Sequence, residues 1–228
     1  MIVAIHQPNY VPWLGYFHKM AAADVFVLLD DVQFTKNSFI NRVRVLGPNG
    51  PRWMSVPVTV SLGDPIMEVM PAQLDWTSRH RDILRQAYRR APAFEAVWPE
   101  ISVLYASVPV ADLATVNRHF IDGLGARLAI ETKTLLSSEI ETGDASGTER
   151  LTKIVSAVAP GGIYLSGHGG GKYQDEAAFE AAGITLRYDR FCHPRYDQLT
   201  SEFVEGLSVL DAVFFLGWNE TRAILKTA

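Results

Sequence analysis

Polar side chains with catalytic potential follow a short apolar run at the start of the chain. Residues 2–5 (IVAI) predict a buried strand, and His6, Gln7 and Asn9 come directly after it. The prolines of this loop exclude strand pairing and a helix interior, and Pro12 suits the first position of a helix. A neutral imidazole suits proton transfer. We therefore interpret His6 as a general base or a substrate ligand, the alternative being a loop histidine bonded to the backbone.

A second apolar run, residues 25–29, also ends in polar residues, Asp30 and Asp31. A helix is expected between the two runs, and strand, helix and strand with short connections predict a parallel βαβ unit. Because parallel strands end at the same sheet edge, this unit brings His6 near Asp30, Asp31 and Gln33. We interpret the aspartates as orienting groups; they could also form an acid–base pair or merely end the strand. Two adjacent carboxylates are too few to predict a metal site.

Two extended segments, residues 42–46 and 52–58, flank an Asn-Gly pair that is typical of a β-hairpin. We expect residues 66–70 to continue this antiparallel unit. Asn41 and Arg42 enter this hairpin, and Arg42 and Arg44 alternate and so share a face. A guanidinium can bind a carboxylate or phosphate through two parallel hydrogen bonds. We expect either an anion-binding role for Arg42 or a solvated edge strand.

A glycine-rich segment, GHGGGKY over residues 167–173, follows a predicted strand at 163–167. A strand, a tight turn and a helix bring backbone N–H groups near an anion or a carbonyl oxygen. The spacing matches neither the P-loop nor the dinucleotide-binding fingerprint, and Ser166 lacks the flanking glycines of a nucleophile elbow. We predict that Ser166, Gly167 and Tyr173 belong to a site, the alternative being a mobile surface loop.

The segment 190–198 places a cysteine beside a histidine. Neighbours on an extended chain point to opposite faces, so Cys192 and His193 are not expected to work as a pair. His193, Tyr196 and Gln198 hold polar groups on one side of the segment, which suits the lining of a cleft.

The order of these elements predicts an α/β fold, with a Rossmann-like, mainly parallel sheet that carries a β-hairpin and a helical insertion. We expect one domain over residues 1–228, with the insertion at about 40–127. The predicted helices, which include an arginine-rich one after residue 77, cover residues 77–90, 94–106, 112–124, 148–159 and 175–182, and residues 203–226 form one or two more. Pro99 is expected to kink or split the helix over 94–106, and a break is expected near Gly217 in the last segment. The arginines indicate a solvated face, or else a docking surface for an acidic carrier domain.

Composition narrows the function classes. A net charge of −4 argues against nucleic-acid binding driven by bulk charge. The single cysteine excludes an internal disulfide and suits a reducing compartment. Met1 leads straight into the first strand, so no signal peptide is expected. No apolar run approaches the roughly 20 residues that span a bilayer. We predict a cytoplasmic protein with a small-molecule substrate.

The ordered motifs resemble the WbqC-like family over nearly the whole chain. The matching segments are IHQPNYVPWLGYFHKM, ADVFVLLDDVQFTK, INRVRV, YLSGHGGGKYQD, HPRYDQ and LSVLDAVFFLG. The resemblance implies a role in making surface polysaccharides or natural products. It suggests acyl or aminoacyl transfer to the amine of an amino sugar or a related acceptor. For this function we expect no cofactor or metal, and we consider an acyl or aminoacyl carrier protein as a partner.

The predicted site follows from the motifs and from this resemblance. The catalytic residues are His6, Asp31, Ser166 and His193. The substrate-binding residues are Gln7, Asn9, Tyr10, Asp30, Gln33, Asn41, Arg42, Gly167, Tyr173, Tyr196 and Gln198. In this hypothesis His6 deprotonates the amine and the Ser166–Gly167 turn stabilises the oxyanion with backbone N–H groups.

Two other function classes stay open. The strand, loop and first helix look like those of HIGH-type nucleotidyltransferases, in which an H-x-G-H motif binds triphosphate. Here Trp13 and Tyr16 occupy the positions of those histidines, so a nucleotidyltransferase or ligase lacks the usual ATP-handling residues. A non-catalytic module that holds a sugar nucleotide or a carrier domain would use the same aromatic residues for stacking.

Overall fold

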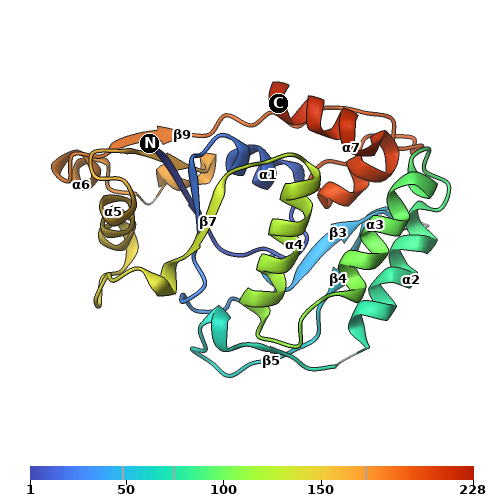
Figure 1. The fold of residues 1–228 in the computed structure, drawn as a ribbon, viewed down its shortest axis with the longest axis horizontal. Helices are drawn as coiled ribbons and strands as arrows, with labels where there is room; N and C mark the ends of the chain where they lie inside the picture. Colours follow the sequence, from blue (N-terminus) through green and yellow to red (C-terminus); the bar gives the residue numbers. More distant parts are fainter. Residues whose placement is uncertain (48, 74, 173) are drawn as a thin grey trace.

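A five-stranded, all-parallel sheet organises the molecule, a computed structural model that describes residues 1–47, 49–73, 75–172 and 174–228 (Figure 1). Tyr173, one of the predicted site residues, lies outside these residues. The strands run in the order β7-β2-β1-β8-β9, and every neighbouring pair is parallel. Their bounds are β1 Ile2–His6, β2 Val25–Leu28, β7 Lys133–Leu136, β8 Ile163–Ser166 and β9 Thr185–Tyr188. The predicted α/β, Rossmann-like fold is confirmed.

The strand order places a topological switch between β1 and β8. From β1 the chain adds β2 and then β7 on one side, and it returns to add β8 and β9 on the other. The loops that leave β1 and β8 therefore diverge to opposite faces, and they leave a crevice at the carboxyl ends of these strands. His6 ends β1 and Ser166 ends β8, so both predicted residues border this crevice.

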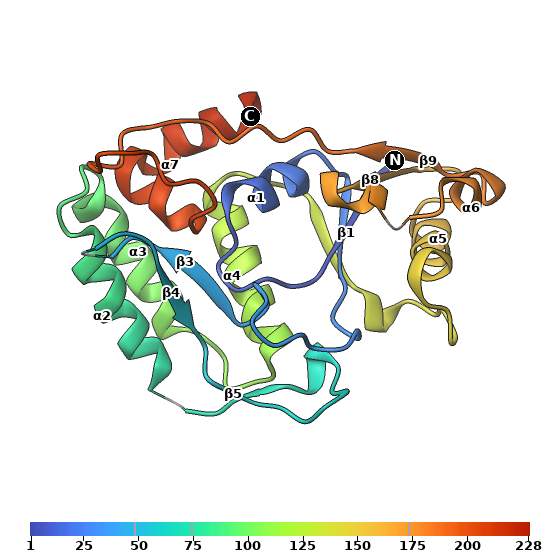
Figure 2. The same ribbon diagram turned by 180° about the vertical axis from the view of Figure 1, so that it is seen from behind.

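Both faces of the sheet are covered by helices (Figures 1 and 2). Successive β1 residues point to opposite faces: Val3 and Ile5 pack in the cluster that contains α5 and α6, whereas Ala4 packs in the larger cluster that contains α1, α4 and α7. A strand that is buried on both faces explains the continuous apolar run in the sequence. The helices are α1 Leu14–Ala21, α4 Leu113–Arg127, α5 Gly147–Val158, α6 Glu176–Ala181 and α7 Val209–Thr227.

The chain between β2 and β7 carries the hairpin and helical insertion. The predicted hairpin forms, with Val43 opposite Met54. The segment around residues 66–70 does not continue this hairpin as expected, because a short helical turn directs it to a separate two-stranded pair. The elements are β3 Arg42–Val45, β4 Arg52–Ser55, β5 Val58–Thr59, η1 Ile66–Glu68, β6 Met70–Pro71, α2 Trp76–Tyr88 and α3 Phe94–Ala106, followed by α4. In both views α2 and α3 lie at the end of the molecule opposite α5 and α6.

The sequence predicted helix starts or breaks at two prolines and one glycine, and the structure confirms only some of them. The last helix breaks at Gly217, whose φ of 78° is non-helical, as predicted. Pro99 lies inside α3, which is one continuous helix rather than two. Pro12 does not begin α1; that expectation is wrong, because Trp13 pairs with Ser208 in an extended conformation and the helix starts at Leu14.

Candidate functional site

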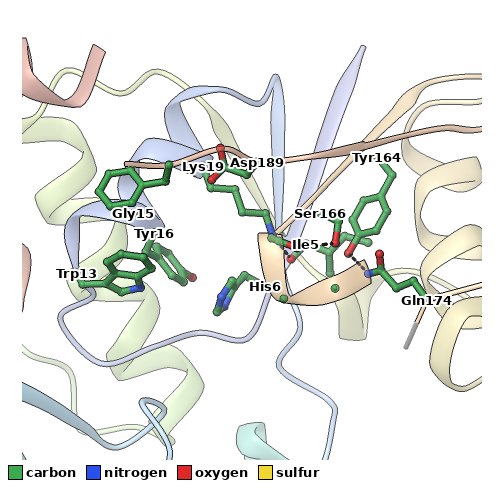
Figure 3. A pocket seen from close by; sticks show the side chains of 14 residues that line it. Ile5, His6, Trp13, Gly15, Tyr16, Lys19, Tyr164, Ser166, Gln174 and Asp189 are labelled. Carbon is green, nitrogen blue, oxygen red and sulfur yellow. Dashed lines mark hydrogen bonds between the residues drawn. The ribbon is translucent and has the colours of Figure 1, made fainter. Parts of the chain in front are cut away.

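A cavity of about 430 Å³ opens at the switch between β1 and β8 (Figure 3). The β1 loop and α1 form one wall, and the turn after β8 with the segment after β9 forms the other. Its lining residues are Ile5, His6, Trp13, Gly15, Tyr16, Lys19, Tyr164, Ser166, Gly167, Gly169, Gly170, Gln174, Asp189 and Phe191. Of the predicted catalytic residues it brings together His6 and Ser166, and of the predicted binding residues Gly167. Doubly wound sheets bind their ligands in the crevice at the switch point, and this volume is typical of a small-molecule pocket.

His6 is the general-base candidate that the cavity contains. Its Nδ1 lies 3.0 Å from the Gln7 carbonyl oxygen, and because a carbonyl only accepts, Nδ1 carries the proton of the neutral ring and Nε2 is left with a lone pair. Tyr16 packs edge-on against the ring at 4.8 Å and also donates to the Gln7 carbonyl at 3.2 Å. Burial, and then the positive charge of Lys19, lower the pKa of His6 to about 4. His6 is therefore neutral at pH 7, and it is a weaker base than a solvated imidazole.

Lys19 is a cavity residue that the sequence reasoning missed. Its side chain is 4% exposed, and its ammonium donates to the Ile5 carbonyl at 2.8 Å. Burial lowers its pKa to about 8, against the opposite pull of Asp189. A lysine in a short amphipathic helix is ordinarily solvated. The available signal was helical spacing: Gly15 and Tyr16 lie four and three residues before Lys19, so all three share the face that lines the cavity.

Trp13 forms an aromatic wall that depends on Gly15. A Cβ atom on Gly15 would lie 2.4–2.8 Å from three atoms of the Trp13 ring, so only glycine lets the indole fold over the first turn of α1. Phe191 packs edge-on against the indole at 5.1 Å. His193 stacks on it with ring centroids 6.5 Å apart and planes 25° apart. His193 thus supports the wall from behind and is not among the residues that line the cavity.

The turn after β8 packs tightly around Ser166. The Ser166 side chain is buried, and its hydroxyl donates to the Gly167 carbonyl at 3.3 Å. Gly170 closes the turn by donating to the same carbonyl at 2.8 Å. A Cβ on Gly170 would come within 2.2 Å of the Ser166 oxygen, so the close approach requires glycine at this position.

The paired aspartates lie at the same sheet edge but outside the cavity. Asp30 accepts from the backbone N–H of Ser138 at 3.0 Å and from its hydroxyl at 2.7 Å. Ser137 donates to both aspartates, and Arg150 forms an ion pair with Asp31. These contacts connect the end of β2 to the turn after β7 and to α5. Asp31 does not line the cavity that holds His6.

The predicted residues of the last segment also form a buried network. Tyr196 and Gln198 both donate to the same carboxylate oxygen of Asp211, each at 2.7 Å. Burial raises the pKa of Asp211 to about 6, and these donors oppose the shift. The network fixes the extended segment, with Phe191 and His193, against α7.

Other predicted binding residues lie away from the cavity. Tyr10 is fully buried, and its hydroxyl contacts His80 at 2.7 Å and Tyr105 at 2.9 Å. Asn9 is buried as well. Gln33 is exposed and forms an isolated bridge with Pro65. Asn41 and Arg42 line a separate open cleft of about 640 Å³, where Asn41 donates to the Val56 carbonyl and Arg42 covers the Trp53 ring at 4.0 Å.

The positions of potential metal-ligating side chains bear on whether the described residues could hold a metal ion. Among the described residues, no three histidine, cysteine or carboxylate side chains come together in a way that could hold a metal ion. Cys192 is exposed. In that same part of the chain no helix combines the length and the apolar character that a bilayer crossing requires.

The fold and the cavity together define a doubly wound α/β protein with a cavity at its switch point, which a neutral histidine and a buried lysine both line. The chain belongs to the WbqC-like protein family, whose model matches residues 7–223. It is 32% identical over 218 residues to the uncharacterized protein Rv1507c of Mycobacterium tuberculosis, covering 94% of each chain. No solved structure matches it.

Proposed function

We propose that the protein is an acyl- or aminoacyltransferase that forms an amide on the amine of an amino sugar or a related small molecule. The observation that carries the proposal is His6, a neutral imidazole at the switch-point cavity whose Nε2 lone pair is left by the Nδ1 contact to Gln7. Membership of the WbqC-like family supports a role in cytoplasmic steps of polysaccharide or natural-product biosynthesis. An acyl or aminoacyl carrier protein suits the role of donor.

In this reaction the acceptor nitrogen attacks the carbonyl carbon of a thioester. A C–N bond forms, the carbonyl oxygen gains negative charge, and the C–S bond then breaks to release a thiol. His6 takes the proton that the nitrogen loses and returns it to the leaving sulfur, so the proton balance closes. The turn at Gly167–Gly170 supplies backbone dipoles on the opposite side of the cavity, and Trp13 excludes water.

The test is turnover with a panel of acyl-coenzyme A thioesters and nucleotide-activated amino sugars. Thiol release and amide mass are the readouts. His6→Ala is expected to lower turnover by about 10²–10⁴-fold, the range of general-base catalysis. His119→Ala is the matched control, because His119 contacts the Leu104 carbonyl away from the cavity. If His6→Ala keeps full turnover, His6 is not the general base. If sugar nucleotides bind but no amide forms from any donor, a non-catalytic binding module is favoured.

A second candidate is a nucleotidyltransferase or ligase. Gly15 and Gly167 line one cavity at the position where doubly wound sheets bind nucleotides. Trp13 and Tyr16 stand where the triphosphate-binding histidines of HIGH-type enzymes would be, which weighs against it. Calorimetry with ATP or CTP and magnesium separates the two: nucleotide binding that Gly15→Trp abolishes supports this candidate, and no binding counts against it.

A further inference from the structure

Lys19 is a buried cation that faces the cavity, and nothing in the proposed acyl transfer yet uses it. It comes from α1, and its side chain extends so that the ammonium reaches Ile5 near the end of β1 (Figure 3). Only 4% of its surface is exposed. Charged side chains are almost never this buried unless a partner of opposite charge accompanies them.

The hydrogen-bond inventory of Lys19 is incomplete. An ammonium has three donors, and within the described residues its hydrogen-bond acceptor is the Ile5 carbonyl at 2.8 Å. Among those residues no carboxylate lies within ion-pair distance of Lys19. Asp189 is the nearest candidate, since it lines the same cavity, but its ion-pair partner is His18 at 3.3 Å.

The surroundings of Lys19 suit a negatively charged guest. His6 and Trp13 are neutral, and the cavity side of the β8 turn consists of Ser166 and glycines. The carboxylate in the lining, Asp189, is ion-paired with His18, so a guest near the ammonium also meets hydroxyl and backbone groups. An anion there would take the two remaining ammonium protons and would supply the missing counter-charge.

We propose that Lys19 binds the anionic group of the cavity's ligand, either the phosphoryl oxygens of a nucleotide-activated substrate or a carboxylate. This inference rests on the proposed function for the identity of the site, and it names the charge that the substrate carries. The anion sits between the end of β1 and the β8 turn, and it orients the rest of the ligand toward His6 and the Trp13 wall. Lys19 is thus the residue that selects anionic substrates.

The experiment measures binding of two simple probes, inorganic pyrophosphate and malonate, by calorimetry at pH 7 with no acyl donor present. Lys19→Met keeps the unbranched side chain, one atom shorter, and removes its charge. Lys226→Met, an exposed lysine near the end of α7, makes the same change of charge outside the cavity. Lys19→Met is expected to weaken probe binding about 10–100-fold, as the loss of a charge-assisted hydrogen bond does, whereas Lys226→Met binds like the wild type.

A second measurement does not depend on how the variant folds. In wild-type protein with isotope-labelled lysine side chains, NMR titration follows the Lys19 pKa, which is about 8 without a ligand. A saturating probe that binds at the ammonium raises this pKa, because an opposite charge favours the protonated form.

The outcomes separate the alternatives. Preference for pyrophosphate identifies a phosphoryl group, and preference for malonate identifies a carboxylate. A wild type that binds neither probe, equal binding by Lys19→Met and wild type, or a Lys19 pKa that a bound probe leaves unchanged each overturn the inference. The binding experiment is independent of the turnover assay of the proposed function. If the probes bind at Lys19 but the turnover assay yields no amide, only the acyl-transfer proposal is contradicted.

Discussion

The contact between Gly15 and the Trp13 ring gives a sharp test of how the cavity wall is built. Both positions lie in the W-L-G segment that opens α1, and Gly15 is buried. In Gly15→Ala the new methyl group would lie within 2.8 Å of three ring atoms of Trp13. A rigid indole cannot bend, so it must swing away from α1 and lose its packing on Phe191 and His193.

Two opposing contributions determine how much Gly15→Ala changes the free energy of unfolding. Overpacking of a well-packed site costs about 1–3 kcal/mol, and replacing a helical glycine by alanine returns about 1 kcal/mol. The net loss is up to about 2 kcal/mol, or about 4–8 °C in Tm for a chain of this size. Gly125→Ala in α4 is the matched control, because its new Cβ would meet Met20 at an ordinary 3.6 Å. It should gain about 0.8 kcal/mol, or about 2–3 °C.

Thermal unfolding and acrylamide quenching of tryptophan fluorescence together measure both parts of the effect. We expect Gly15→Ala to unfold at a lower temperature than wild type and to quench more strongly, because the displaced Trp13 becomes accessible. Gly125→Ala should unfold at a higher temperature with unchanged quenching. If Gly15→Ala matches Gly125→Ala in both readouts, Trp13 does not depend on Gly15 and the account of the wall is refuted.

Two further predictions concern buried polar groups. Between about pH 4 and 6 folded Asp211 holds a proton that the unfolded chain releases, since its pKa is raised from 3.8 to about 6, so its contribution to stability falls by about 3 kcal/mol as pH rises through that window. Urea unfolding should show that Asp211→Asn lacks this loss and the exposed control Asp144→Asn keeps it; equal slopes in all three proteins would contradict the assignment. Tyr10→Phe leaves both His80 and Tyr105 without their hydrogen-bond partner, and it should lower the free energy of unfolding by about 1–3 kcal/mol. Tyr105→Phe should cost less, because Tyr10 stays bonded to His80. A larger loss for Tyr105→Phe in urea unfolding would disprove the network.

Local patterns were sufficient to predict most of the fold. The apolar run of β1, the Asn-Gly hairpin and the break at Gly217 each rest on residues a few positions apart, and each appears as predicted. Pro12 shows the limit of such rules. Its position suited a helix start, but pairing of Trp13 with Ser208, far along the chain, delays the helix. Long-range pairing is absent from any local pattern.

The site was harder to predict because polar side chains find their partners across long sequence distances. Asp30 and Asp31 follow a strand, as catalytic carboxylates often do, but Ser137, over a hundred residues later, donates to both. Lys19 shows the opposite case. Its helix looked like a positioning element, and only the strand order reveals that its inner face borders the crevice beside β8.

Several polar residues of the predicted site connect a loop near the carboxyl edge of the sheet to a distant element. Tyr196 and Gln198 bind Asp211 on α7, and through their segment they hold Phe191 against Trp13. Asp31 joins the end of β2 to α5 through Arg150. A switch-point cavity between two divergent loops has no regular hydrogen-bonding ladder of its own, so such side-chain networks must supply its rigidity. The cluster of polar motifs in the sequence therefore marks both the proposed ligand site, at His6, Lys19 and Ser166, and the framework that keeps the walls of its cavity in place.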